Sequence, residues 1–403
     1  MSNQVTSAAG TSQTTKTGVC FPSGFTASGV AAGLKASGTL DLALVANNGQ
    51  NPTSAAVFTS NRVVAEPVIY TRDLMAKNTV THVILNSGNA NACTGQRGME
   101  DVQATVAALA SEADINPTQV AVCSTGVIGE YMDIDRLTRA IPALVKENNE
   151  DGANLAAQAI MTTDTVSKEV EIEQDGWRIG GMAKGAGMLA PAMATMLCVI
   201  TTDVKISEDA LERTLQRAVD VSFNRTDTDG CMSTNDTVIV LASGESGIEP
   251  DEAEFGAQLE IACRDLAGKL RDDAEGASHS IDIEVTGASS EEAAVEVARA
   301  VSRSNLVKTA IFGNDPNWGR ILSQIGTVDA QVAPFDVNDV NVSINGVQIC
   351  RNGGIGDPKD GLDLAASRLV TIEIELGAGD AEATVYTSDL THDYVHENSA
   401  YTT

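Results

Sequence analysis

The residues best suited to chemistry lie at the Ala194-Thr195 peptide bond. The four histidines and seven cysteines are scattered and include no C-x-x-C pair, so neither a Cys-His nucleophile nor a zinc site has local support. A threonine at a chain terminus needs no such partner, because its hydroxyl is the nucleophile and its α-amine, with a pKa of about 7.7–8.0, is the base. Cleavage before Thr195 would create that residue. A structural Thr at the start of a strand is the alternative interpretation.

The segments on either side of this bond fit that chemistry. Residues 180–194 are rich in Gly and Ala, which allows tight backbone geometry. The apolar run 196–200 predicts a buried strand that would hold a new terminus rigidly. Met188 and Met193 are expected to pack in the core.

Hydrophobic periodicity predicts the elements that must position this bond. One helix is expected to begin at Ser207, which Glu208 and Asp209 follow, and another at a capping box formed by Ser289 and Glu292. Period-two alternation predicts strands at 281–285 and 370–376.

A hairpin is predicted near the C-terminus, where apolar runs at 340–344 and 347–349 flank Asn345-Gly346, a dipeptide typical of a type I′ turn. Antiparallel pairing interleaved with helices predicts a layered α/β fold with mixed sheets. Residues 1 to about 17 and the Gly- and Asp-rich stretch 353–361 are predicted to be disordered.

Composition excludes several functions. The 26 basic and 55 acidic side chains give a net charge of −29, and only 3% of residues are aromatic, so we expect no nucleic-acid binding. The polar N-terminus and the lack of an 18-residue apolar run predict a cytoplasmic protein without membrane contact. Residues 1–194 carry −6 and residues 195–403 carry −23. This skew is typical of a solvated surface; repulsion of an anionic ligand is the alternative.

A series of motifs runs along the chain from about residue 18 to 403. The run GAGMLAPAMATML from Gly185 contains Thr195. The others are PSGFTASGVAAGLK from Pro22, LNSGNANACTG from Leu85, STGVIGE from Ser124, IMTTDT from Ile160, STNDTV from Ser233, DPNWGRI from Asp315 and HDYVHENSAYTT from His392. Together they resemble the glutamate N-acetyltransferase (ornithine acetyltransferase, ArgJ) family, and the first resembles its self-cleavage segment.

This resemblance implies a self-cleaved N-terminal-nucleophile enzyme with the layered α/β fold of the DmpA/ArgJ-like type. Cleavage between Ala194 and Thr195 would give an α chain, 1–194, and a β chain, 195–403, which associate as α2β2. Thr195 would take the acetyl group of N2-acetylornithine and pass it to glutamate in ping-pong fashion, as arginine biosynthesis requires. No cofactor is implied, and use of acetyl-CoA as a second acetyl donor stays open.

The resemblance also implies roles for other residues. Thr125 and Gly126 match the family's oxyanion hole, which we place at a strand-to-loop turn after the apolar run 120–123. The positions that match substrate-binding residues are Thr162 or Thr163, Thr195, Lys184, Glu275, Asn398 and Thr403. Lys184 suits a substrate carboxylate and Glu275 suits the side-chain ammonium of ornithine.

Two other functions compete with this interpretation. In an N-terminal-nucleophile amidohydrolase or aminopeptidase, water rather than glutamate would resolve the acyl-enzyme. A non-catalytic amino-acid-binding protein would never cleave its own chain.

Overall fold

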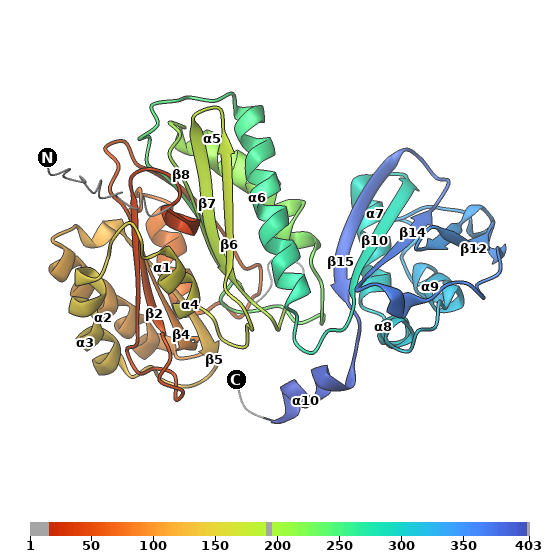
Figure 1. Cartoon of the computed structure of the whole chain (residues 1–403), viewed down its shortest axis with the longest axis horizontal. Coiled ribbons are helices and arrows are strands. Elements are labelled where there is room, and N and C mark those ends of the chain that lie inside the picture. The colour runs from red at the N-terminus through yellow and green to blue at the C-terminus, as the bar shows by residue number, and fades with distance from the viewer. Residues whose placement is uncertain (1–15, 191–195, 401–403) are drawn as a thin grey trace, which may run out of the picture.

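The computed structural model describes residues 16–190 and 196–400, which form two lobes (Figure 1). Two sheets and their helices make the larger lobe, and a third sheet makes the smaller one. The last helix, α10 (His392–Ala400), leaves the smaller lobe and runs beside the larger one. The described residues contain no helix long and apolar enough to cross a membrane.

The first sheet of the larger lobe has the strand order β1-β2-β4-β5. Only β4 and β5 pair in parallel, and the other neighbours are antiparallel. Helices α2 and α3 cover its outer face. The elements are β1 (Phe25–Val30), β2 (Leu42–Asn47), β4 (His82–Asn89), β5 (Val120–Val127), α2 (Gly95–Ala113) and α3 (Ile134–Lys146).

The second sheet has the order β3-β9-β8-β7-β6, in which only β8 and β9 are parallel. Helices α5 and α6 cover its outer face. The predicted strand at 196–200 is confirmed as β8. The elements are β3 (Thr53–Phe58), β6 (Lys168–Gln174), β7 (Trp177–Lys184), β8 (Leu197–Thr202), β9 (Thr237–Ala242), α5 (Glu208–Asp220) and α6 (Glu252–Asp272).

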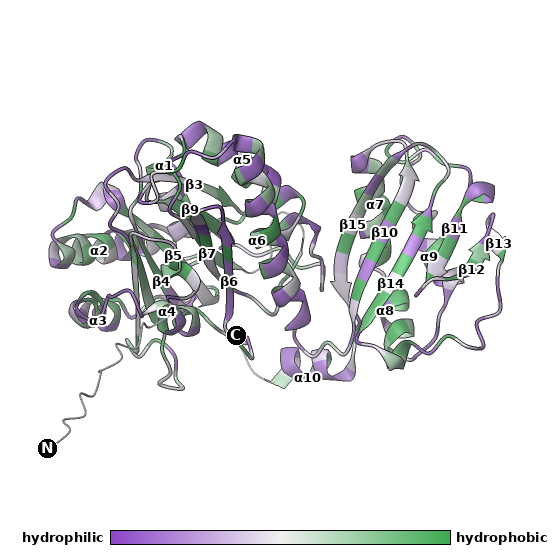
Figure 2. Ribbon diagram, turned by 45° about the horizontal axis from the view of Figure 1, so that its top comes forward, coloured by the Kyte–Doolittle hydropathy of each residue, from purple (hydrophilic) through white to green (hydrophobic). Residues whose placement is uncertain are grey.

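A shared core joins these two sheets face to face. Side chains alternate along β8, so that Leu197 and Val199 point toward the first sheet while Cys198 and Ile200 point toward α5 and α6. Helices α1 (Glu66–Met75) and α4 (Ala153–Ala159) complete the lobe. The layers therefore run helix, sheet, sheet, helix, and apolar residues concentrate in the two sheets (Figure 2). The predicted layered α/β fold with mixed sheets is confirmed.

The smaller lobe has its own sheet and its own apolar core, with helices on one face. Its strand order is β13-β12-β11-β14-β10-β15, and only β10 and β14 are parallel. The elements are β10 (Ser280–Ala288), β11 (Asn341–Ile344), β12 (Val347–Arg351), β13 (Gly354–Ile355), β14 (Leu369–Glu375), β15 (Ala381–Ser388), α7 (Glu291–Ser302), α8 (Asn305–Phe312) and α9 (Trp318–Ile325). Short 3₁₀ helices occur at Gly18–Cys20, Pro117–Gln119, Phe223–Arg225, Val337–Asp339 and Leu364–Ala366.

The helix caps and turns of both lobes confirm some of the local predictions and correct others. Ser207 caps α5 as predicted, and the hairpin turns at Asn345 and Gly346 with φ of 47° and 78°, as a type I′ turn requires. Helix α7 is capped by Ser290 rather than Ser289, because the Ser290 hydroxyl accepts the Ala293 N–H. The expectation of disorder at 353–361 is wrong for β13, which pairs with β12. The other segment predicted to be disordered, residues 1 to about 17, lies mostly outside the described residues.

The second sheet interleaves the two halves of the sequence. Strands β3, β6 and β7 precede residue 194, whereas β8 and β9 follow it. Strand β3 pairs with β9 over six residue pairs, and β7 pairs with β8 over another six. Main-chain ladders therefore hold the two halves together on both flanks of the β8-β9 pair.

Candidate active site

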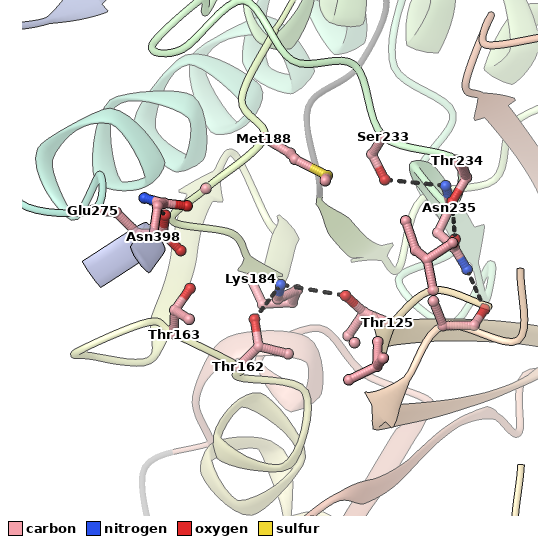
Figure 3. A pocket seen from close by; sticks show the side chains of 15 residues that line it. Thr125, Thr162, Thr163, Lys184, Met188, Ser233, Thr234, Asn235, Glu275 and Asn398 are labelled. Carbon is pink, nitrogen blue, oxygen red and sulfur yellow. Dashed lines mark hydrogen bonds between the residues drawn. The ribbon is translucent and has the colours of Figure 1, made fainter. Parts of the chain in front are cut away.

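One cavity of about 290 Å³ collects the polar residues that the sequence singles out. It opens where the ends of β5 and β7, the turn after α6 and helix α10 approach one another (Figure 3). Its lining includes Thr125, Gly126, Thr162, Thr163, Lys184, Glu275 and Asn398. Further lining residues are Ala90, Val127, Ile128, Gly187, Met188, Ser233, Thr234 and Asn235.

The described residues resume directly after the predicted nucleophile, Thr195. Ala194, Thr195 and Thr403 lie outside the described residues. Immediately after Thr195, the buried Met196 donates its backbone N–H to Asp236 Oδ1 at 3.0 Å. Leu197, the first residue of β8, pairs with Lys184 on β7. The described chain therefore resumes beside a lining residue of the cavity.

The two predicted oxyanion-hole residues lie inside β5. Thr125 and Gly126 pair with Ser87 and Gly88 of β4, so the expected strand-to-loop turn is corrected to a position within the strand. Gly126 has a φ of +131°, and a Cβ there would lie 2.4 Å from the carbonyl carbon of Gly88. Only glycine fits this close approach of two backbones. The Thr125 side chain is buried beside it at the cavity wall.

Lys184 ends β7 and points its ammonium into this group of hydroxyls. It is only 1% exposed, and its Nζ donates to Thr162 Oγ1 at 2.7 Å and to Thr125 Oγ1 at 3.4 Å (Figure 3). Burial lowers the pKa of Lys184, and the charge of Asp164 opposes that shift. Both Thr162 and Thr163 line the cavity, and Thr162 is the one bonded to Lys184.

The opposite side of the cavity carries a carboxylate. Glu275 follows α6, and its backbone N–H donates to Ala186 O at 3.0 Å. Its Oε2 accepts Asn398 Nδ2 of α10 at 2.9 Å. A Cβ on Gly187 would lie 2.5 Å from Glu275 Oε2, so the small residue is needed for the close approach of the two segments. The cavity thus has a cation with hydroxyls at one side and a carboxylate at the other (Figure 3).

Two acidic residues within the motifs were not assigned a role from sequence. Asp164, in IMTTDT, accepts hydrogen bonds from Lys168 and from the backbone N–H groups of Thr162 and Gly185. Asp236, in STNDTV, is fully buried, and burial raises its pKa well above the ordinary value. The sequence did contain a signal for both residues. Asp164 directly follows the matched threonines and Asp236 directly precedes an apolar strand, and a charge buried at such a position is costly unless it is paired.

The STNDTV motif also supports β5, the strand that carries the two predicted oxyanion-hole residues. Asn235 donates from Nδ2 to Ala90 O at 2.6 Å and to Ser124 O at 2.9 Å. One side chain thus fixes the loop before β9 against the residue that precedes Thr125. This contact explains why a polar amide occupies a buried position there.

Met188 departs from the expectation of core packing. Its side chain is 42% exposed and lines the cavity, and its φ of +54° is rare for a residue with a Cβ. The Met188 N–H donates to Asp229 Oδ2 at 2.7 Å, which holds the backbone in this conformation. Met193 lies outside the described residues.

A family model and two relatives match most of the chain in sequence. The family model described as "ArgJ family" matches residues 26–403. An "Arginine biosynthesis bifunctional protein ArgJ" of Streptomyces avermitilis is 52% identical over 94% of this chain and 98% of its own. The protein of the same name from Bifidobacterium longum is 53% identical over 95% and 99%. A solved structure, ornithine acetyltransferase complexed with ornithine from Mycobacterium tuberculosis, is 47% identical, covers 45% of this chain and 97% of its own, and has a TM-score of 0.43.

Proposed function

The chain belongs to the ArgJ family, and on that premise we infer that it is the glutamate N-acetyltransferase (ornithine acetyltransferase) of arginine biosynthesis. Its substrates are N2-acetylornithine and glutamate. The observation that carries this inference is the single cavity that joins Thr125, Gly126 and Lys184 with Glu275 and Asn398. Segments that are far apart in the sequence contribute residues to this cavity.

We propose that Thr195 is the nucleophile. Its neutral α-amine removes the hydroxyl proton while the oxygen attacks the acetyl carbonyl carbon of N2-acetylornithine. The negative charge that develops on the carbonyl oxygen is stabilised by the Thr125 hydroxyl and the Gly126 N–H. The carbon–nitrogen bond then breaks, the α-nitrogen of ornithine leaves with the proton, and an acetyl ester remains on Thr195. The amine of glutamate attacks this ester, which restores Thr195 and forms N-acetylglutamate.

The two sides of the cavity suit the two ends of this substrate. Glu275 would face the side-chain ammonium of ornithine, with Asn398 holding the carboxylate of Glu275 in place. Lys184 and the hydroxyls of Thr162 or Thr163 would face the α-carboxylate. We propose that Thr403 completes the site from the C-terminus.

Self-cleavage between Ala194 and Thr195 is part of the same proposal. Two residues after Thr195 in the sequence, Leu197 pairs with Lys184, which lines the cavity. This pairing supports a cleavage site close to the cavity. The resulting α and β chains would stay associated through the β3-β9 and β7-β8 ladders, and we propose an α2β2 assembly in the cytoplasm.

The word "bifunctional" in the names of the relatives supports a second reaction for this chain. We propose that acetyl-CoA also acetylates Thr195, so that glutamate receives an acetyl group from either donor. No resident cofactor is needed for either transfer.

The test is a transfer assay on the purified protein. Ornithine release from N2-acetylornithine should require glutamate and should match N-acetylglutamate formation. Release that ignores glutamate would instead support the amidohydrolase. A parallel assay with acetyl-CoA and glutamate tests the second donor.

Mass spectrometry under denaturing conditions tests the cleavage separately. Two fragments that meet at Ala194 and Thr195 are expected, whereas an intact 41.9 kDa chain contradicts the nucleophile assignment. Thr195→Ala should abolish both cleavage and transfer.

A further inference from the structure

A buried network of four charged side chains lies directly behind the cavity. Lys168, at the start of β6, donates from Nζ to Asp164 Oδ1 at 2.7 Å and to Asp273 Oδ2 at 2.6 Å. The Nζ of Lys184 lies 3.9 Å from Asp164 Oδ2. The side chains of Asp164, Lys168 and Lys184 are at most 1% exposed, and that of Asp273 is 10% exposed. Burying such charges is costly unless each is paired, so this arrangement requires an explanation beyond packing.

Asp164 is the centre of this network. Besides Lys168, it accepts the Thr162 N–H at 3.0 Å and the Gly185 N–H at 2.6 Å. Those two backbone groups belong to a cavity-lining threonine and to the residue directly after Lys184. One carboxylate therefore fixes the two segments that carry the hydroxyl and the ammonium of the site.

The network also reaches the opposite side of the cavity. Asp273 accepts the Thr165 N–H at 2.9 Å, so it bonds both to Lys168 and to the loop that contains Asp164. Asp273 stands two residues before Glu275 in the turn after α6. Lys168 therefore connects the loop that carries Thr162 with the turn that carries Glu275.

The protonation state of Lys184 decides what the neighbouring hydroxyls can do. An ammonium only donates, so the Thr125 and Thr162 oxygens accept from it and their own hydrogens point elsewhere. A neutral amine can accept, and it would draw a hydroxyl hydrogen away from the substrate oxygen. An oxyanion hole that uses the Thr125 hydroxyl thus works only while Lys184 stays charged.

We propose that Asp164 is a positioning residue for acetyl transfer, which holds Lys184 as an oriented ammonium so that the Thr125 hydroxyl donates to the oxyanion. This inference rests on the proposed function and assigns to it a residue that does not touch the substrate. Burial alone would raise the pKa of Asp164, but Lys184, Lys168 and the Thr162 N–H lower it to about 2, so the carboxylate stays ionised.

Other charged groups also face Lys184. They are Lys168 on β6, Asp236 before β9, Glu275 after α6 and, after β1, Lys35. The acids oppose the loss of its proton, and the two lysines favour it. Substitution of Asp164 and substitution of Lys168 are therefore expected to move the titration of Lys184 in opposite directions, which general damage to the fold would not do.

The experiment measures kcat/KM for acetyl transfer from N2-acetylornithine to glutamate against pH, in the full protein. In Asp164→Asn, Lys184 loses its nearest anion, so its pKa falls and the alkaline limb should move to lower pH by about 1–2 units. In Lys168→Met, a nearby cation disappears and the limb should move to higher pH. Asp273→Asn is the matched control. It also removes a carboxylate partner of Lys168, but Asp273 is 10% exposed and bonds to Lys168 rather than to Lys184. The alkaline limb of its pH profile should therefore stay near that of the unsubstituted protein.

Each outcome either supports or contradicts the proposed role of Asp164. An Asp164→Asn enzyme that loses activity at all pH values with an unmoved limb has only a structural defect, and the proposal is then wrong. If Asp164→Asn fails to fold, a shift of the alkaline limb to higher pH in Lys168→Met still supports the proposal. An alkaline limb that is unmoved or absent in Lys168→Met overturns it. Absence of transfer in the unsubstituted protein would contradict the proposed function instead.

Discussion

The two lobes differ in where they keep their charges. In the larger lobe, Asp164, Lys168, Lys184 and Asp236 are buried behind or beside the cavity. The smaller lobe packs an apolar cluster between its helices and its sheet, and its strands place carboxylates on the outer face of the sheet. Its buried charged residues include Lys308, which bonds to Thr228, and Asp389, which bonds to His279. Ile372 and Ile374 point inward, while Glu373 and Glu375 are exposed. The buried charges beside the cavity therefore bond to residues that line it, whereas the outer carboxylates of the smaller lobe face away from its apolar core.

The largest expected effect breaks the chemistry and leaves both lobes folded. Thr125→Val removes the hydroxyl proposed as an oxyanion donor, so kcat for acetyl transfer should fall about 100-fold or more. The control is Thr214→Val, which removes another buried hydroxyl, bonded to Ala210 O within α5. Steady-state kinetics and thermal melts of both variants test this. Equal losses of activity in the two variants would mean that buried hydroxyls matter only for stability.

A smaller effect is expected from the apolar core of the other lobe. Ile372 is completely buried in β14, and Ile372→Val should lower the free energy of unfolding by about 0.5–1.5 kcal/mol. Denaturant unfolding measures this change. The transfer rate of the folded protein should stay unchanged, and a fall in kcat without loss of structure would show that the smaller lobe takes part in catalysis.

The smallest effect concerns the acidic face of that lobe. Glu284 of β10 lies directly opposite Glu373 of β14, and burial together with Glu373 raises the pKa of Glu284. Because the folded state holds this proton more tightly than the unfolded state, the pair favours folding at low pH and opposes it above the raised pKa. Glu373→Lys should therefore stabilise the protein at neutral pH by about 0.2–1 kcal/mol. Glu375→Lys, two residues away and opposite Thr286, makes the same charge change but also loses the hydrogen bond from Asn341 Nδ2. Equal stabilisation by both variants would point to net charge alone.

Sequence patterns predicted the smaller lobe in more detail than the site. The type I′ hairpin at Asn345-Gly346 and the alternating strand at 370–376 follow from local rules, and both are confirmed. The cap of α7 was misplaced by one residue, because Ser289 and Ser290 are equally good caps on composition and only the backbone conformation selects Ser290.

The residues of the site followed from resemblance, not from periodicity. Seven of the matched positions line one cavity. The role of Asp164 could not be predicted, because its contacts with Lys184 and with Gly185, which is 21 residues away, come only from the fold. Lys168 resembles any strand lysine in the sequence, although it is 1% exposed. Contacts between Lys168 and Asp273, which are 105 residues apart, come only from the fold.

The interleaved second sheet has a consequence for the mature protein. Strands β7 and β8 are neighbours in one sheet, and they would belong to two polypeptide chains after the proposed cleavage before Thr195. Unfolding of the cleaved protein would release two fragments, so mass action would make its melting temperature rise with protein concentration. In an uncut Thr195→Ala chain the melting temperature should depend less on concentration, because only the association of whole chains with one another remains. Processing would thus turn a property of a single chain into a property of a complex.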